Sequence, residues 1–88
     1  MKKCYIISYD MAKGGDYDEL IEAIKEYNTW AHITESTWAV VTEESHNEIR
    51  DNLGQFLPKG SRLFVLKSGS SGAWRNVICR SEWLKENL

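Results

Sequence analysis

Hydrophobic and polar positions fall into blocks along the chain, and the first blocks predict a strand followed by a helix. Residues 3–9 are apolar, β-branched or aromatic at most positions, which is typical of a buried strand, and turn residues follow in 10–16. Residues 17–27 carry apolar side chains at the i, i+3, i+4, i+7 spacing of an amphipathic helix. Asp16 precedes this helix and Glu19 follows three residues later, as in a capping box.

The next blocks predict two adjacent strands and a second helix. Residues 29–33 and 37–42 are rich in Thr, Trp, Val and Ile, which favours a β-hairpin. A helix is expected to begin at Ser45, because Glu48 completes a second capping-box pattern. Pro58 marks its end.

A short, fully apolar run in residues 62–67 predicts a central strand. The resulting order of strand, helix, strand, strand, helix, strand is typical of ferredoxin-like folds. We therefore predict an α+β, ferredoxin-like βαββαβ domain over residues 1–67, with an antiparallel four-stranded sheet and two helices on one face. Residues 68–88 are expected to form a glycine-serine hinge and a C-terminal strand/helix appendix, capped at Ser81, that packs on the same domain or on a partner subunit.

Composition narrows the class of protein. The chain has 88 residues, of which 42% are hydrophobic, which suits one domain and leaves no room for a second. A chain this short buries only about 60% of its unfolded surface, so we expect it to form a homodimer. Its net charge of −2 disfavours binding dominated by nucleic-acid phosphates, although it does not exclude nucleic acid as a partner.

The lengths of the apolar runs indicate where in the cell the protein is expected. No apolar run approaches the roughly 20 residues of a membrane span, and Asp10 interrupts the N-terminal apolar stretch before it reaches the length of a signal-peptide core. We expect a cytoplasmic protein with no membrane partner. Cys4 and Cys79 are then expected to be reduced thiols.

Candidate chemistry is sparse. Asp10, at the end of the first predicted strand, is the main candidate, because ligand-binding and catalytic groups gather in the loops that follow strands; the alternative is a turn residue. The cysteines and histidines, Cys4, Cys79, His32 and His46, match no zinc-ligand spacing. His32 shares a strand face with Trp30 and is expected to line a groove or interface or to serve structurally, whereas His46 is expected to be exposed in the first turn of the second helix.

Four tryptophans stand out in so short a chain: Trp30, Trp38, Trp74 and Trp83. They are suited to core and dimer packing, and alternatively to stacking on bases. Few cations lie among them: Arg75 is next to Trp74 and Arg80 is near Trp83. We therefore favour packing over stacking.

The run Tyr5-Ile6-Ile7-Ser8-Tyr9-Asp10 resembles the first strand of the small CRISPR-associated adaptation subunits that partner the spacer integrase, and of the related virulence-associated toxin family. The segment Thr34-Glu35-Ser36-Thr37-Trp38-Ala39-Val40 is similar to the second turn and third strand of that family. The similarity in element order covers about residues 3–67. It implies a ferredoxin-like fold and a two-fold homodimer.

The resemblance also implies an activity. Several members are metal-dependent nucleases acting on RNA or DNA, and the aspartate that ends their first strand corresponds to Asp10. Asp10 is thereby implied as both catalytic residue and ligand of Mg²⁺, paired with its copy across the dimer. The alternative is a non-catalytic protein-interaction module, such as a toxin-antitoxin component or a phage or host inhibitor, since the chain is slightly acidic.

Overall fold

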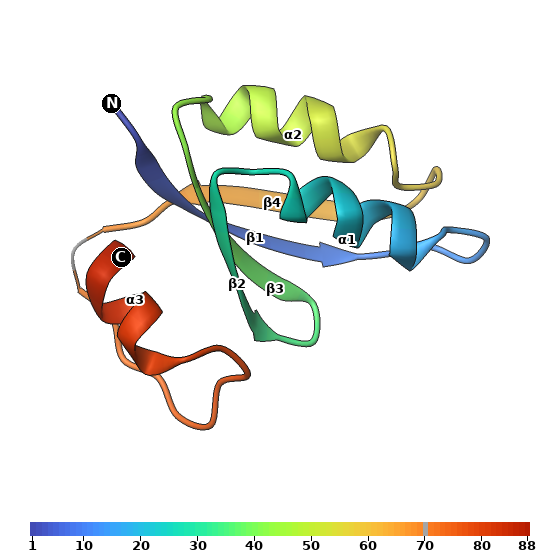
Figure 1. Ribbon diagram of the computed structural model, residues 1–88. Coiled ribbons are helices and arrows are strands. Elements are labelled where there is room, and N and C mark those ends of the chain that lie inside the picture. Colours follow the sequence, from blue (N-terminus) through green and yellow to red (C-terminus); the bar gives the residue numbers. More distant parts are fainter. Residues whose placement is uncertain (70) are drawn as a thin grey trace.

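Seven helices and strands follow one another in an order that contains the expected βαββαβ unit. The computed structural model describes residues 1–69 and 71–88. The elements are β1 (Lys3–Asp10), α1 (Tyr17–Lys25), β2 (Thr29–Thr34), β3 (Thr37–Thr42), α2 (His46–Gly54), β4 (Arg62–Lys67) and α3 (Ser81–Asn87). The strands form one antiparallel sheet in the order β2-β3-β1-β4. The helices α1 and α2 lie on one side of the sheet and α3 on the other (Figure 1), so the predicted α+β fold is confirmed.

The register of β1 decides which side chains face the helices. Ile7 lies opposite Trp38 of β3 and Val65 of β4, and all three point to the side that α1 and α2 cover, called here the inner face. Because successive side chains alternate across a strand, the next residue, Ser8, points to the outer face, as does its partner Phe64. One strand thus contributes to two different surfaces.

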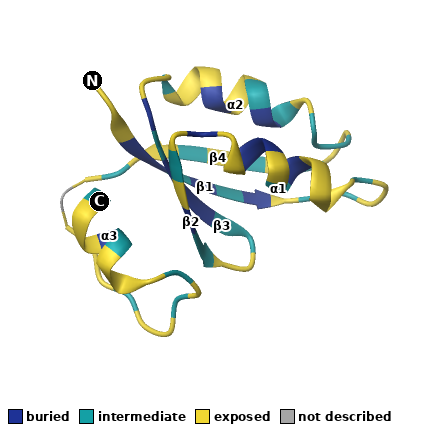
Figure 2. Ribbon diagram, viewed as in Figure 1, coloured by how far each residue is buried: buried dark blue, intermediate teal, exposed yellow. Residues whose placement is uncertain are grey.

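The core lies between the inner face and the two helices. Leu20 and Ile24 of α1 and Ile49 and Leu53 of α2 are fully buried against β1 and β3. Buried positions gather in β1, β3, α1 and α2, whereas α3 and the segment before it are mostly exposed (Figure 2). The helical spacing of the apolar residues in the sequence is the direct cause, since it places them on one side of each helix.

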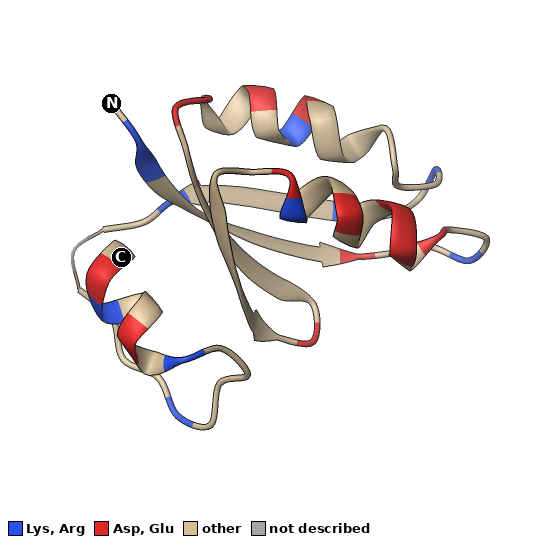
Figure 3. Cartoon of the chain, viewed as in Figure 1, with Lys and Arg blue, Asp and Glu red and all other residues tan. Residues whose placement is uncertain are grey.

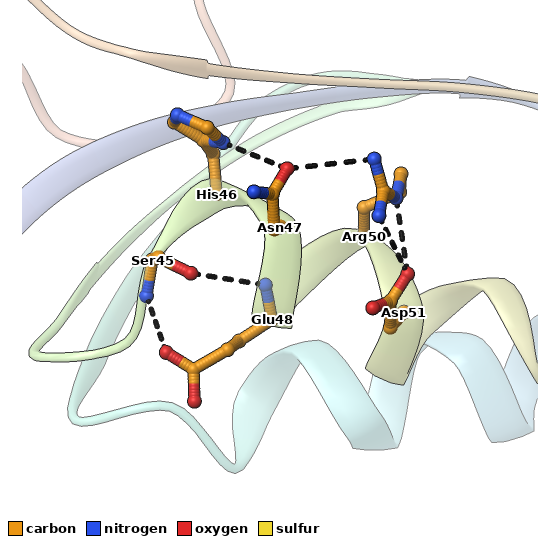
Figure 4. A network of polar contacts seen from close by, with 6 residues as sticks. All are labelled: Ser45, His46, Asn47, Glu48, Arg50 and Asp51. Carbon is orange, nitrogen blue, oxygen red and sulfur yellow. Dashed lines mark hydrogen bonds and ion pairs between the residues drawn. The ribbon is translucent and has the colours of Figure 1, made fainter.

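Both helices of the core begin at the caps that the sequence predicts. The Ser45 hydroxyl accepts a hydrogen bond from the Glu48 backbone N–H at 3.2 Å, and the Glu48 carboxylate accepts one from the Ser45 backbone N–H at 3.0 Å (Figure 4). Asp16 caps α1 by accepting from the backbone N–H groups of Asp18 and Glu19. These bonds satisfy N–H groups that have no partner inside the helix.

The strand β4 lies at an edge of the sheet, so the prediction of a central strand in residues 62–67 is wrong. Phe64 and Leu66 point to the outer face and are 61% and 51% exposed. The apolar run is interior on one side only, where Val65 packs against the core. The flanking cations Arg62 and Lys67 are the sequence feature that fits an edge, because charges at the ends of an edge strand discourage unwanted pairing.

The C-terminal appendix contains the expected helix, α3, but no strand among its described residues, 71–88. Asn76 adopts a positive φ of 55°, which breaks an extended conformation, and the segment before α3 is irregular. Arg80 rather than Ser81 occupies the N-cap, and the Ser81 hydroxyl instead accepts a hydrogen bond from the Trp74 indole N–H. The expected hinge at 68–72 includes residue 70, which lies outside the described residues.

This C-terminal segment packs against β2 of the same chain. The Ile78 backbone N–H donates to the Ile33 carbonyl at 2.9 Å, and the Trp83 indole N–H donates to the Thr29 hydroxyl at 3.0 Å. Leu84 is buried, and so is Ala31 on β2. The contacts attach the segment to the edge of the sheet opposite β4.

The helices of the described chain are short. Both α1 and α2 have nine residues, and α3 has seven. Within residues 1–69 and 71–88, no helix has the length and apolar character needed to cross a membrane.

We expect the capping box of α2 to stabilise the fold measurably. The substitution Ser45→Ala removes the side-chain acceptor of the Glu48 N–H and should lower the free energy of unfolding by about 1 kcal/mol. Urea unfolding followed by circular dichroism measures the change. The matched control is Ser71→Ala at an exposed position, which should stay within about 0.5 kcal/mol of the wild type; equal effects of the two substitutions would contradict the assignment.

We also expect two core tyrosines to ionise at a higher pH than an exposed tyrosine does. Burial raises the pKa of Tyr9 and of Tyr27 above the ordinary value of 10, although the hydrogen bond that Tyr27 accepts from Asn52 at 2.9 Å opposes the shift. The neutral phenols are therefore favoured by folding. Their contribution to stability should be complete below pH 10 and lost as the pH rises through the folded-state pKa.

The measurement is an ultraviolet titration of tyrosinate in the native and the urea-unfolded chain. The titration curve of the native chain should lie at higher pH than that of the unfolded chain, and Tyr27→Phe should remove part of this difference. Coinciding curves would show that burial does not perturb these groups.

Candidate functional site

Asp10 is the last residue of β1, and its side chain is accessible. It lies opposite Arg62, the first residue of β4, and the Asp10 carboxylate and the Arg62 guanidinium are 3.6 Å apart. Their side chains are 71% and 84% exposed, so this is a surface ion pair that contributes about 0–1 kcal/mol. The carboxylate is thus free to exchange Arg62 for another partner.

The loop after Asp10 is held closely to the start of β4, which fixes the end of β1. The Ala12 backbone N–H donates to the Ser61 hydroxyl at 2.8 Å. Gly15 lies so near Pro58 that an added Cβ would come within 2.9 Å of the proline Cδ. A larger side chain at this glycine would push the loop away from the turn that precedes β4.

Within the described residues, Asp10 does not belong to a cluster of metal-ligating side chains. In residues 1–69 and 71–88, no group of three or more His, Cys, Asp or Glu residues is arranged to hold an ion. A guanidinium next to Asp10 also opposes a cation there. Proteins hold Mg²⁺ with one or two carboxylates together with water and phosphate oxygens, and Asp10 offers one carboxylate to such a site.

The other candidate ligands are dispersed. Cys4 and Cys79 are free, and burial raises the pKa of both thiols, which keeps them from the thiolate form that nucleophiles need. His46 is exposed at the start of α2, as expected. His32 stacks on the Trp38 ring with centroids 4.1 Å apart, and its Nε2 lies 3.2 Å from the Glu35 carbonyl oxygen.

The outer face of β4 carries an apolar patch that the sequence prediction missed. Phe64 and Leu66 are exposed on it, and the half-buried Ile6 of β1 lies opposite Leu66. We call these three residues the β4 patch. The sequence signal was present, because a run flanked by Arg62 and Lys67 fits an edge strand with one exposed side.

The β4 patch and Asp10 share one face. Ser8 lies opposite Phe64, and Asp10 is two residues further along β1, so its side chain also points outward. Anything that covers the β4 patch therefore borders the Asp10 carboxylate. The structure brings together an exposed apolar surface and Asp10, which the sequence had placed in unrelated contexts.

The helical side of the molecule is acidic. A pocket of about 560 Å³ lies between α1 and α2, and four carboxylates line it: Glu26, Glu44, Glu48 and Asp51. No Lys or Arg is among its described lining residues. Acidic residues are distributed along both helices (Figure 3), so this side of the molecule repels a phosphate backbone. A nucleic acid is therefore expected to approach a different side of the molecule.

The tryptophans have different environments. Trp38 is buried in the core, as the packing interpretation expects. Trp74 is partly exposed next to α3. Trp30 and Trp83 line one pocket at the edge of β2 together with Arg80, so two of the four lie beside a cation.

Comparison with protein-family models, with curated proteins and with solved structures found no match for this chain. The resemblance to the adaptation subunits therefore stays a prediction that depends on the residues of β1 and on the segment 34–40.

Proposed function

We propose that this protein is a small interaction module that forms a homodimer through the β4 patch. The single observation that carries the proposal is the exposure of Phe64 and Leu66 side by side on an edge strand. A domain of this size buries a small fraction of its surface on its own, and covering large apolar side chains adds stability. The first candidate to cover the patch is a second copy.

A two-fold symmetric dimer needs only one patch on each protomer. A two-fold axis brings the same surface of both copies together, so the β4 patch of each protomer contacts the β4 patch of the other. The C-terminal segment already occupies the opposite edge of the sheet, along β2, through Ile78 and Trp83. The edge formed by β4 is accordingly the one at which another chain can add.

A second candidate function is nucleic-acid cleavage with Mg²⁺, and the position of Asp10 favours it. Its exposed carboxylate lies on the same face as the β4 patch, so a dimer through that patch places two such carboxylates at the border of one interface. The resemblance of β1 to the adaptation subunits supports the same residue. The acidic helical side and the neighbouring Arg62 favour the non-catalytic module.

Self-association should depend on Phe64. We expect the wild type to be a dimer by sedimentation equilibrium, and Phe64→Ser to weaken it at least about 100-fold, because two phenyl groups per dimer leave the interface and each contributes about 1.5–3 kcal/mol when fully buried. The matched control is Ile78→Ser, which is also 61% exposed but lies outside the patch. A monomeric wild type at high micromolar concentration, or equal weakening by both substitutions, would contradict the proposal.

Nuclease activity should require Asp10 if the second candidate holds. RNA and DNA substrates incubated with Mg²⁺ should be cleaved by the wild type and not by Asp10→Asn, whereas Asp18→Asn, at an exposed carboxylate on α1, should keep full activity. Chelation of the metal should abolish cleavage. A dimeric wild type that is as inactive as Asp10→Asn would leave the interaction module as the function.

A further inference from the structure

An apolar pocket lies where the C-terminal segment meets the edge of β2. Its volume is about 280 Å³. It is lined by residues 30–32 of β2 and by residues 78–80 and Trp83 of the C-terminal segment. The pocket does not include Asp10 or the β4 patch, which lie toward the opposite edge of the sheet. Its existence depends on the way the last residues pack against β2.

The two indole rings of the pocket are held in place by contacts of their own. Trp30 lies under the Lys25 ammonium, 4.9 Å from the ring centroid, and its ring contacts that of Trp38 at 5.6 Å. Trp83 is oriented by the hydrogen bond from its indole N–H to the Thr29 hydroxyl. Aromatic rings that are already positioned lose little freedom when a ligand binds.

The size and the lining suit one flat ring. A volume of 280 Å³ lies just below the usual range of about 300–1,000 Å³ for small-molecule pockets, so the pocket can take a single ring system and not a large ligand. Nucleobases stack on aromatic side chains regardless of sequence. Trp30 is 38% exposed, so part of its ring remains accessible for such stacking.

A cation stands beside the pocket. The Arg80 side chain is 85% exposed, and its only ion pair among the described residues is a loose one, with Nε of Arg80 3.9 Å from the Glu82 carboxylate. A guanidinium binds phosphate well through its forked N–H donors. An anionic group attached to a stacked ring would compete with Glu82 for Arg80.

We propose that this pocket binds one nucleobase in contact with the indoles of Trp30 and Trp83, with the attached phosphate held by Arg80. The nucleobase can belong to a free nucleotide or to a single strand of nucleic acid, since both present the same ring and phosphate. The site is independent of whether Asp10 cleaves nucleic acid and of whether the β4 patch forms a dimer.

The probes are uridine 5′-monophosphate, ribose 5-phosphate and a short fluorescein-labelled oligouridylate, measured by calorimetry and by fluorescence anisotropy on the full chain. Binding of the monophosphate and of the oligonucleotide, without binding of ribose 5-phosphate, supports the pocket and identifies a ligand that can be free. Binding of the oligonucleotide alone supports the pocket as a single-strand site. Binding of neither nucleobase-containing probe, or equal binding of ribose 5-phosphate, overturns the proposal.

Variants locate the binding. Trp30→Ala should weaken it about 5- to 150-fold, the range found when a stacking aromatic is removed, and circular dichroism must show an intact fold. Arg80→Gln should weaken it about 10-fold and reduce its salt dependence, whereas Arg75→Gln, at an exposed cation outside the pocket, should change neither.

A substitution at Glu82 is expected to strengthen binding, whereas the substitutions above weaken it. Glu82→Gln frees Arg80 from its carboxylate and should strengthen binding several-fold. A loss of binding in this variant, an unchanged affinity in a folded Trp30→Ala variant, or equal effects at Arg75 and Arg80 would each overturn the assignment.

Discussion

The packing of β1 against α1 and α2 is the contact on which the rest of the structure depends. Tyr5, Ile7 and Tyr9 place their side chains into the core beside Leu20 and Ile24, and together they form the centre of the only large apolar cluster among the described residues. Since β1 pairs with β3 on one side and with β4 on the other, this contact also sets the register of the sheet. The outer face then follows automatically, because neighbouring residues alternate across the strand.

The outer face of the sheet is covered near β2 and exposed near β4. Toward β2, the C-terminal segment covers it, and Ala31 and Ala39 are buried there although they point away from the helices. Toward β4, nothing in the described chain covers Phe64 and Leu66. The outer face therefore has two distinct parts: a covered part that borders a pocket, and an exposed apolar part next to Asp10.

Local patterns predicted most of the elements because their causes are local. The cap at Ser45 needs only Glu48 three residues later, and the buried side of α1 needs only its helical spacing. The edge position of β4 was indicated only by the flanking cations Arg62 and Lys67, since the apolar run itself has the same composition whether one or two of its sides are covered. The expected strand in the appendix failed for a related reason: a positive φ at Asn76 and a single backbone hydrogen bond to Ile33 do not make a ladder.

The sequence by itself determined the order of the elements, the helix caps, the inner core and the candidacy of Asp10, because each depends on residues a few positions apart. Only the tertiary structure decided that Asp10 shares a face with Phe64, and that Trp30 and Trp83, more than fifty residues apart in the chain, line one pocket with Arg80. Such juxtapositions depend on strand order and on where the last residues dock. Those are outcomes of packing between distant segments, which no local pattern in the sequence encodes.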